Sequence, residues 1–469
     1  MFKRLLIANR GEIAVRIIRA CQELGIETVA VYSDVDEHAL HVQLADFSYP
    51  IGPADPFMSY LNMDAILEAA DATGAEAIHP GYGFLSESAE FAEKVEDAGL
   101  VWVGPSAETL RLVGNKDAAR AAMLAAGLPM TKGSDIIASN DDAYAKAKEI
   151  GYPVILKPVS GGGGKSMFVI YTDADMESAL NKVDVTKQAF YFETYIETSR
   201  HIEVQIMCDN YGHTIHLVER ECSIQRRNQK ILEEAPSSAL TVEMRDKVGK
   251  LAIRAAKSVH YTNIGTVEFL LDTKTGEFYF MEINPRIQVE HGVTEAITGI
   301  DLVRRQIRIA SGEPLNKRQS DITFFGHAIE CRINAEDPEN RFIPSPGLLE
   351  FYHEPAGPRV RVDSGVCAGL TIEPYYDSLI AKVVAYGRTR GDAIKIMRRA
   401  LNEFRVGGIK TTIPLHKQIL ADSHFCTGNL DTQFLNKRMP LYEANKNRVQ
   451  KKRSKGNSST EASVMISQW

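Results

Sequence analysis

The chain has 469 residues, of which 44% are hydrophobic and 25% are charged, a balance typical of ordinary globular proteins. This length is enough for two or three domains, each with its own core. The net charge of −7 argues against nucleic acid as the main partner. No stretch reaches the roughly 20 apolar residues of a membrane-spanning helix, and the first apolar run is too short for a signal peptide. We therefore expect no nucleic-acid partner and no membrane segment.

The six cysteines are scattered along the chain, and no two of them form a C-x-x-C pair. The sequence therefore offers neither a zinc ribbon nor a disulfide framework. Isolated thiols are typical of a reducing compartment, so we expect a cytoplasmic protein.

The first hundred residues alternate between short apolar strands and amphipathic helices. The expected elements are strands at 5–8, 28–32 and 101–104 and helices at 12–24 and 87–97. Such βαβ alternation predicts a parallel sheet. The first turn contains only Gly11 and lacks G-x-G-x-x-G, which disfavours NAD or FAD. The glycine-rich turn at 79–86 is expected to border a ligand site, although a turn that needs glycine for geometry alone fits almost as well.

A second unit is expected to begin near residue 115, with a helix at 116–126. Two strands, at 152–157 and 167–171, then flank a loop that contains four consecutive glycines. The loop ends in Gly-Lys-Ser like a Walker A motif, but Val159 stands where that motif needs glycine, and no helix follows. We interpret the loop as a flap whose bare amides can approach phosphate oxygens. A plain linker is the alternative, but linkers rarely join two strands of one hairpin.

The stretch 278–291 alternates between polar and apolar residues with a period of two, which predicts a strand with one buried side. Its polar face carries Glu282, Asn284, Arg286, Gln288 and Glu290. An upstream strand at 265–272 and a turn through Gly276 would place Glu268 directly opposite Glu282. Because like charges in that position are destabilising, Mg²⁺ is expected between them. A solvated hairpin with scattered charge is the alternative.

Glu282 and Glu290 would lie about 27 Å apart in a fully extended strand, at 3.3 Å per residue, which is too far for one site. Pro285 cannot donate to a strand ladder. We therefore predict that the chain bends at Pro285 and folds residues 286–290 back over the site.

Further polar groups follow in the second half of the chain. His201, Glu203 and Gln205 share one face of a strand, but the P-C-x-x-C of a zinc deaminase is missing. The cluster of Arg226, Arg227 and Lys230 is either a solvated basic strand or an anion pocket. The remaining region mixes short strands with a helix at 390–404, and its polar tail at 447–469 is expected to be disordered.

With these motifs assembled, the chain resembles the biotin carboxylase component of biotin-dependent carboxylases, of the kind found in acetyl-CoA carboxylase and pyruvate carboxylase. The motifs that carry the resemblance lie at 6–14, 79–87, 161–164, 222–227, 286–291, 330–337 and 374–378. The resemblance extends from residue 1 to about residue 440. It implies an α/β and α+β ATP-grasp enzyme. Its expected parts are a Rossmann-like domain at 1–114, an ATP-grasp domain at 115–330 with a lid at about 132–200, a mixed α+β domain at 331–446 and the tail.

The resemblance implies ATP- and bicarbonate-dependent carboxylation of biotin through carboxyphosphate. Glu290 would be the base that deprotonates bicarbonate, and Arg332 would stabilise the biotin enolate beside Tyr82. Bicarbonate would be held by Lys230, Arg286, Gln288 and Val289. Mg²⁺ or Mn²⁺ would be held by Glu268, Glu282 and Asn284. ATP would be held by Lys116, Lys157, Gly163, Gly164, Glu193, Thr194, Tyr195, Ile196, His201, Gln225 and Asn228.

The chain contains no Ala-Met-Lys-Met motif for biotin attachment. The resemblance therefore implies a separate biotin carboxyl carrier protein, a separate carboxyltransferase and a homodimer. Compared with the usual family pattern, the chain departs at Thr194, Asn228, Gly292 and the pair Lys165-Ser166, and the segment 167–190 is several residues short. Another ATP-grasp ligase, an inactive subunit that docks the carrier, and a dehydrogenase are the alternative functions.

Overall fold

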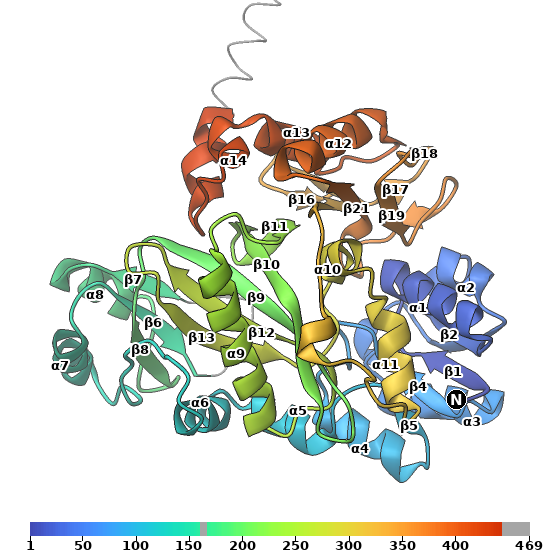
Figure 1. Ribbon diagram of the computed structural model, residues 1–469, viewed down its shortest axis with the longest axis horizontal. Coiled ribbons are helices and arrows are strands. Elements are labelled where there is room, and N and C mark those ends of the chain that lie inside the picture. Colours follow the sequence, from blue (N-terminus) through green and yellow to red (C-terminus); the bar gives the residue numbers. More distant parts are fainter. Residues whose placement is uncertain (160–166, 443–469) are drawn as a thin grey trace, which may run out of the picture.

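The N-terminal segment forms a five-stranded parallel sheet in the order β3-β2-β1-β4-β5 (Figure 1). Its strands are β1 (Arg4–Ile7), β2 (Glu27–Ser33), β3 (Phe47–Gly52), β4 (Ala77–His79) and β5 (Val101–Trp102). Its helices are α1 (Gly11–Leu24), α2 (Leu40–Leu44), α3 (Met63–Thr73), α4 (Ala89–Asp97) and α5 (Ala107–Gly114). The βαβ alternation of the sequence therefore predicted this sheet correctly.

A computed structural model of the chain describes residues 1–159 and 167–442. The four glycines at 161–164 and the tail at 447–469, for which we predict a flap and disorder, lie outside the described residues. Among the described residues, no helix combines the length and the apolar character needed to cross a membrane.

An eight-stranded sheet spans the middle and the C-terminal part of the chain, in the order β13-β12-β9-β10-β11-β14-β21-β19. Its strands are β9 (Ser199–Cys208), β10 (Thr214–Arg226), β11 (Gln229–Ala235), β12 (Asn263–Asp272), β13 (Phe278–Asn284), β14 (His327–Asn334), β19 (Val360–Ser364) and β21 (Leu379–Gly387). All of its neighbouring strands are antiparallel. The sheet therefore continues across residue 330, where we expect a domain boundary, through the pairing of β11 with β14.

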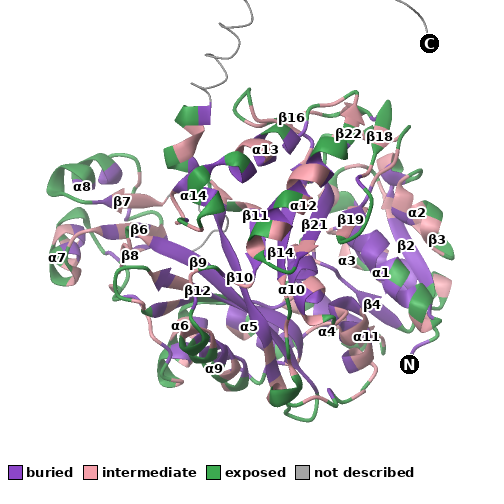
Figure 2. Ribbon diagram, turned by 45° about the horizontal axis from the view of Figure 1, so that its top comes forward, coloured by how far each residue is buried: buried purple, intermediate pink, exposed green. Residues whose placement is uncertain are grey.

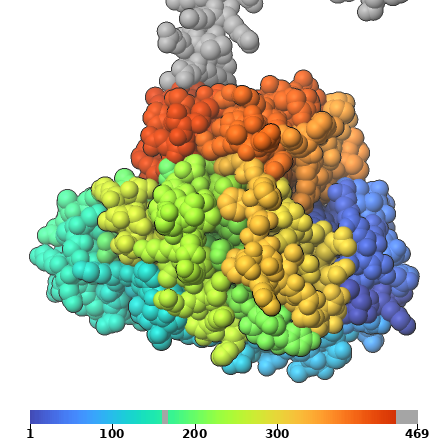
Figure 3. Space-filling model, in the orientation of Figure 1, coloured from blue at the N-terminus to red at the C-terminus, as the bar shows by residue number. Residues whose placement is uncertain are grey.

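Helices cover the large sheet, and short ladders extend its C-terminal end. The helices are α6 (Lys116–Ala125), α9 (Val242–Ser258), α10 (His291–Thr298), α11 (Leu302–Ala310), α12 (Arg390–Glu403), α13 (Ile413–Ala421) and α14 (Ser423–Cys426). The ladders are β15 (Glu336–Asp337) with β16 (Ile343–Pro344), β17 (Gly347–Leu348) with β20 (Thr371–Ile372), and β18 (Phe351–His353) with β22 (Arg405–Gly407). Figure 3 shows the C-terminal part of the chain, in orange and red, above the green and yellow middle of the chain.

A separate three-stranded sheet lies at the far side of the molecule from the N-terminal segment (Figure 1). It consists of β6 (Val154–Pro158), β7 (Phe168–Ile170) and β8 (Phe190–Thr194), covered by α7 (Asn140–Ile150) and α8 (Asp173–Leu180). Strands β6 and β7 are antiparallel neighbours on either side of the tetraglycine loop. The prediction of two hairpin strands flanking that loop is therefore confirmed.

Both faces of the large sheet are buried near its centre (Figure 2). All ten residues of β9 are buried. Ile202, Val204 and Ile206 pack in the same apolar core as α9, whereas His201, Glu203 and Gln205 are buried on the opposite, polar face. The alternation in the sequence thus separates an apolar core from a polar interior instead of separating core from solvent.

The predicted bend at Pro285 is confirmed, but the strand was predicted too long. Strand β13 ends at Asn284, and α10 begins at His291, so residues 286–290 form a turn. Met281, which the period-two pattern assigned to the buried side, is 40% exposed. The reason is a bulge, because the ladder changes register between Glu268 and Phe269 and leaves Met281 unpaired.

The packing of α12 on β21 generates a prediction about stability. Met397 is fully buried in that core, whereas Lys395 lies on the exposed side of the same helix. Met397→Ala should lower the apparent free energy of unfolding by about 2–5 kcal/mol, because it leaves a cavity. Lys395→Ala should change it by less than about 0.5 kcal/mol. Urea unfolding measures both values, and equal losses would show that α12 is not packed as described.

Candidate active site

A lysine ammonium group lies among three buried carboxylates on the polar face of the large sheet. Lys230 Nζ, on β11, donates to Glu268 Oε1 at 2.8 Å and to Glu290 Oε1 at 2.7 Å. It also forms a short ion pair with Glu203 on β9. Because buried charges are costly unless they are paired, these contacts fix the position of each group. Burial alone would lower the pKa of Lys230, but the three carboxylates raise it well above its usual value.

Two guanidinium groups complete the cluster. Arg332 on β14 donates to Glu290 Oε2 at 2.9 Å and to Glu233 Oε1 at 2.6 Å. Arg220 on β10, which is fully buried, pairs with Glu203. Burial would raise the pKa of Glu290, but Lys230, Arg332 and Arg220 hold it well below its usual range. These cations therefore favour the ionised form of Glu290.

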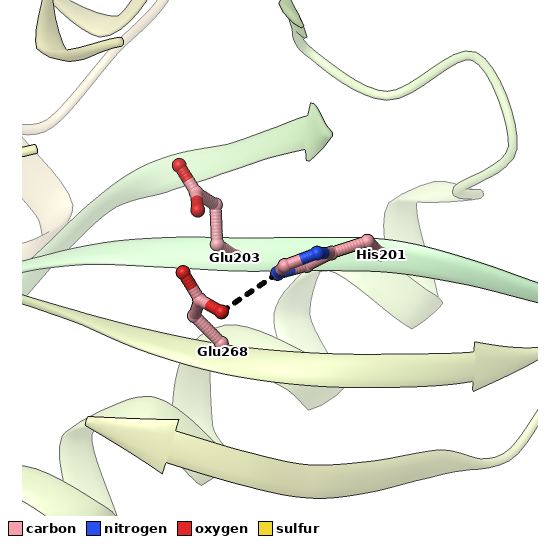
Figure 4. A group of neighbouring side chains, drawn as sticks. All are labelled: His201, Glu203 and Glu268. Atoms are coloured by element: carbon pink, nitrogen blue, oxygen red, sulfur yellow. Dashed lines mark ion pairs between the residues drawn. The ribbon is translucent and has the colours of Figure 1, made fainter. Parts of the chain in front are cut away.

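His201 extends the cluster along β9 toward the beginning of that strand. Figure 4 shows His201 and Glu203 projecting from β9 beside Glu268 of the neighbouring strand, and His201 Nε2 lies 2.9 Å from Glu268 Oε2. Burial would lower the pKa of His201, but Glu268 raises it. The other ring nitrogen, Nδ1, lies 2.6 Å from Gln225 Nε2. Gln225 and His201, both expected to contact the nucleotide, are therefore neighbours.

The acidic residues form one row across the sheet. Glu282, Glu268, Glu203 and Arg220 are successive cross-strand partners on β13, β12, β9 and β10. The predicted pairing of Glu268 with Glu282 is therefore confirmed. Like charges in such positions repel, and the row is stabilised by Lys230 and His201 near Glu268 and by Arg220 at its end. These cations are side chains of the protein. From the sequence we expected only a metal ion between Glu268 and Glu282.

The outer end of this row fits a divalent cation. Glu282 is reached by solvent, yet desolvation of its carboxyl and then the negative charge of Glu268 raise its pKa. A bound cation would relieve that repulsion, and carboxylate and amide oxygens are ligands that Mg²⁺ prefers. Asn284, the next residue on the same side of β13, is buried beside them and accepts a hydrogen bond from Arg286.

The turn at 286–290 is held by side chains from distant parts of the chain. Arg286 Nε donates to Glu87 Oε1 at 2.6 Å, and Arg286 Nη1 donates to Gln288 Oε1 at 3.1 Å. Gln288 in turn donates to Glu268 at 3.1 Å. Glu87 directly follows the glycine-rich turn 79–86, so the end of that turn borders the site, as one of our two interpretations predicts.

Other expected nucleotide residues lie on the three-stranded sheet and at the start of α6. Lys157 on β6 pairs with Glu193 on β8 at 2.9 Å, and Thr194, Tyr195 and Ile196 follow along the chain. Lys116 begins α6 and is exposed. Gly163 and Gly164 lie outside the described residues.

The basic cluster expected at 226–230 is divided between different neighbours. Arg226 stacks on the ring of Phe342 at 3.8 Å, and Arg227 and Asn228 are exposed in the hairpin turn, with φ of 48° and 63°. Lys230 alone of these basic residues joins the carboxylates. The turn rotates consecutive side chains to different sides, so these basic residues have different neighbours, and the anion pocket stays one of our two interpretations.

Three residues of the cluster carried no role in the sequence analysis, namely Glu203, Arg220 and Glu233. The signal for Glu203 was present, since it alternates with His201 and Gln205 in an otherwise apolar strand. Arg220 stands between Glu219 and Glu221 in the otherwise largely buried strand β10, and its guanidinium also contacts Gln205 and Thr294. A charged residue at an inward position of a buried strand is the pattern that would have identified them.

Comparison with known proteins gives the same assignment over almost the whole chain. A family model described as "Biotin carboxylase, N-terminal domain" matches residues 1–110, and "Biotin carboxylase C-terminal domain" matches residues 330–437. Between them, "Carbamoyl-phosphate synthase L chain, ATP binding domain" matches residues 115–318. The chain belongs to the biotin carboxylase family. It is an enzyme that carboxylates biotin with ATP and bicarbonate, and the predicted ATP-grasp architecture is confirmed.

Individual relatives cover nearly the same residues. Biotin carboxylase 1 of Bacillus subtilis is 54% identical over 445 residues, which are 93% of this chain and 98% of that protein. The 2-oxoglutarate carboxylase small subunit of Hydrogenobacter thermophilus is 47% identical over 94% of this chain and 95% of its own length. A crystal structure of the biotin carboxylase domain dimer of that carboxylase, with MgADP, ADP and bicarbonate, is 48% identical. It aligns with a TM-score of 0.88 and covers 93% of this chain and 98% of that one.

A buried histidine behind Arg332 makes stability depend on pH. His416 Nε2 donates to the Arg332 carbonyl oxygen at 2.6 Å, and burial lowers its pKa to about 4. The unfolded chain therefore takes up this proton first, so stability is lost as pH falls from about 6.5 toward 4. His416→Gln, whose amide also donates, should remove up to about 1.4 kcal/mol per pH unit from that slope. Urea unfolding of both proteins at several pH values measures the difference, and parallel slopes would contradict it.

Proposed function

We propose that Glu290 is the general base that deprotonates bicarbonate in this reaction. The observation that carries the proposal is the position of its carboxylate between Lys230 and Arg332, at 2.7 and 2.9 Å. Those cations weaken Glu290 as a base, but they would also acidify a bicarbonate bound beside it. The two groups would therefore exchange a proton within the same field.

We propose that Lys230, Arg286, Gln288 and Val289 hold bicarbonate. The first two are cations at the 286–290 turn: Lys230, on β11, donates to the Glu290 carboxylate, and Arg286, which belongs to the turn, donates to Glu87 and Gln288. A planar guanidinium suits a planar one-carbon acid because its donors lie in one plane. The deprotonated oxygen would then attack the γ-phosphate of ATP and give carboxyphosphate and ADP.

The nucleotide would extend from the acidic row toward the three-stranded sheet. Lys157, Glu193 and the residues after it, together with His201 and Gln225, are the proposed contacts. Glu268, Glu282 and Asn284 would hold Mg²⁺, which neutralises charge on the phosphates when it is bound. Lys116 and Asn228 remain predicted contacts.

Carboxyphosphate would release CO₂, and the freed phosphate would take the proton from biotin. Arg332 would stabilise the biotin enolate, because its guanidinium is fixed by Glu233 and Glu290 and points into the cluster. Tyr82, which we propose as the residue bordering biotin, donates its hydroxyl proton to Glu12 in a short hydrogen bond.

We further propose that biotin is carried on a separate protein and passed to a separate carboxyltransferase. A name such as "2-oxoglutarate carboxylase small subunit" supports a multi-subunit enzyme, and the dimeric relative supports a homodimer. All six cysteines are unpaired. This fits our proposal that the enzyme works in the reducing cytoplasm.

The first test is Glu290→Gln, which keeps the shape of the side chain but cannot accept the proton. Biotin-dependent release of phosphate from ATP should fall by about 10²–10⁴-fold. Glu219→Gln is the matched control, because Glu219 is also a buried carboxylate paired with an arginine, Arg245, and it should retain turnover. Turnover that persists in Glu290→Gln would refute the assignment of the base.

The second test concerns the metal. Glu282→Gln should raise the Mg²⁺ concentration needed for half-maximal turnover by on the order of tenfold or more, because it removes a charged ligand. Glu277→Gln, an exposed carboxylate of the same hairpin that pairs with Lys247, should leave that concentration unchanged. Titration of each variant with MgCl₂ at saturating ATP measures it. Identical curves for both variants would remove Glu282 from the metal site.

A further inference from the structure

A second lysine, Lys382, is buried directly behind the 286–290 turn. It lies on β21, its side chain is fully buried, and its Nζ donates to the Val289 carbonyl oxygen at 2.8 Å. Glu12, in the first turn of α1, lies 3.1 Å from the same nitrogen. Asp363 on β19 lies 3.8 Å away. None of these contacts is used by the chemistry described above.

Lys382 lies beside a second cation in the sheet, and the acidic side chains of Glu12 and Asp363 compensate its charge. Lys382 is the cross-strand partner of Arg332 on β14, and like charges in that position repel. The two cations reach consecutive residues of the turn, since Lys382 donates to the Val289 carbonyl and Arg332 to the Glu290 carboxylate. The Val289 carbonyl belongs to the peptide plane that carries the Glu290 nitrogen. Together the two side chains therefore fix both the backbone and the side chain of the proposed base.

The contact of Lys382 with Glu12 connects the N-terminal segment to the lysine that holds the 286–290 turn. Glu12 is 3% exposed, and one of its carboxylate oxygens accepts from both Lys382 and Tyr82. Gly365, at the end of β19, lies against the start of α1, where an added Cβ would be 2.4 Å from the Glu12 nitrogen. The C-terminal strands therefore approach α1 closely enough for Lys382 to reach Glu12.

We propose that Lys382 is a positioning residue, which orients Glu290 for bicarbonate through the Val289 carbonyl, and that Glu12 is the counter-charge that keeps Lys382 in place. The proposal rests on the function proposed above for Glu290. It adds that binding of bicarbonate depends on Lys382, which is not among the residues proposed to contact bicarbonate or ATP.

The test compares Lys382→Met with the double variant Lys382→Met/Glu12→Gln in the full-length enzyme. Both remove the donor to Val289, but only the single variant leaves Glu12 without its lysine. We expect kcat/KM for bicarbonate to fall by on the order of 10²-fold in both variants, because the base is displaced. The KM for ATP should stay within about twofold of the wild type, because no nucleotide contact is removed.

Asp422→Asn is the matched control for the loss of a buried ion pair. Its carboxylate oxygen accepts from Arg438 and from the Tyr442 hydroxyl, as that of Glu12 accepts from Lys382 and Tyr82. A purely structural role for Lys382 predicts that its variants behave like Asp422→Asn, with a lower melting temperature and no selective change toward bicarbonate. Recovery of wild-type kcat/KM in the double variant would also overturn the proposal, because it would show that only charge balance matters.

The same assay separates this inference from the function on which it rests. If Glu290→Gln retains turnover, the proposed base is wrong and Lys382 has nothing to orient. If Glu290→Gln is inactive while Lys382→Met keeps the wild-type dependence on bicarbonate, only the positioning role fails. Size-exclusion chromatography and isothermal titration with ADP establish that each variant is folded and still binds nucleotide.

Discussion

The ion pairs between Lys230 and its three carboxylates are the constraint on which the rest of the site depends. Glu203, Glu268 and Glu290 are buried, and an unpaired charge in such a position costs several kcal/mol. One ammonium group cannot compensate three carboxylates, so other cations must approach the same point. Arg220, Arg332 and His201 meet that requirement. The cluster therefore determines where five strands and one turn must lie relative to one another.

The order of strands in the sheet explains how this cluster forms. Neighbouring strands β12, β9, β10, β11 and β14 contribute, in that order, Glu268, Glu203, Arg220, Lys230 and Arg332. Each of these strands supplies one charged residue to the cluster, acidic on β12 and β9 and basic on β10, β11 and β14. Each contact between like charges in this row lowers the stability of the fold, as is common at functional sites. The compensating contacts are specific, and they leave the cluster with one arrangement.

The sequence predicted those features that depend on residues close together in the chain. The hairpin that pairs Glu268 with Glu282 needs only a turn at Gly276, and the bend at Pro285 needs only the chemistry of proline. By contrast, the pairing of Glu203 with Arg220 depends on the register between β9 and β10, which the sequence alone does not reveal. The bulge near Met281 likewise leaves no mark on the alternation of polar and apolar residues. The resemblance to a family supplied the roles of Arg332 and Tyr82, which no local pattern distinguishes. Nothing in the sequence connects Glu12 with Lys382, because most of the chain separates them and only the folded sheet brings them together.

The two ends of the site are built differently, and the chemistry explains why. The proposed bicarbonate end is a single turn, which contacts Glu87 from the N-terminal segment, Glu268 from the middle and Lys382 from the C-terminal strands. The proposed adenine end lies on a small three-stranded sheet with its own apolar core. Phosphoryl transfer depends mainly on positioning the nucleophile against the phosphate. The three contacts to the turn, each from a different part of the chain, meet this requirement at the proposed bicarbonate site.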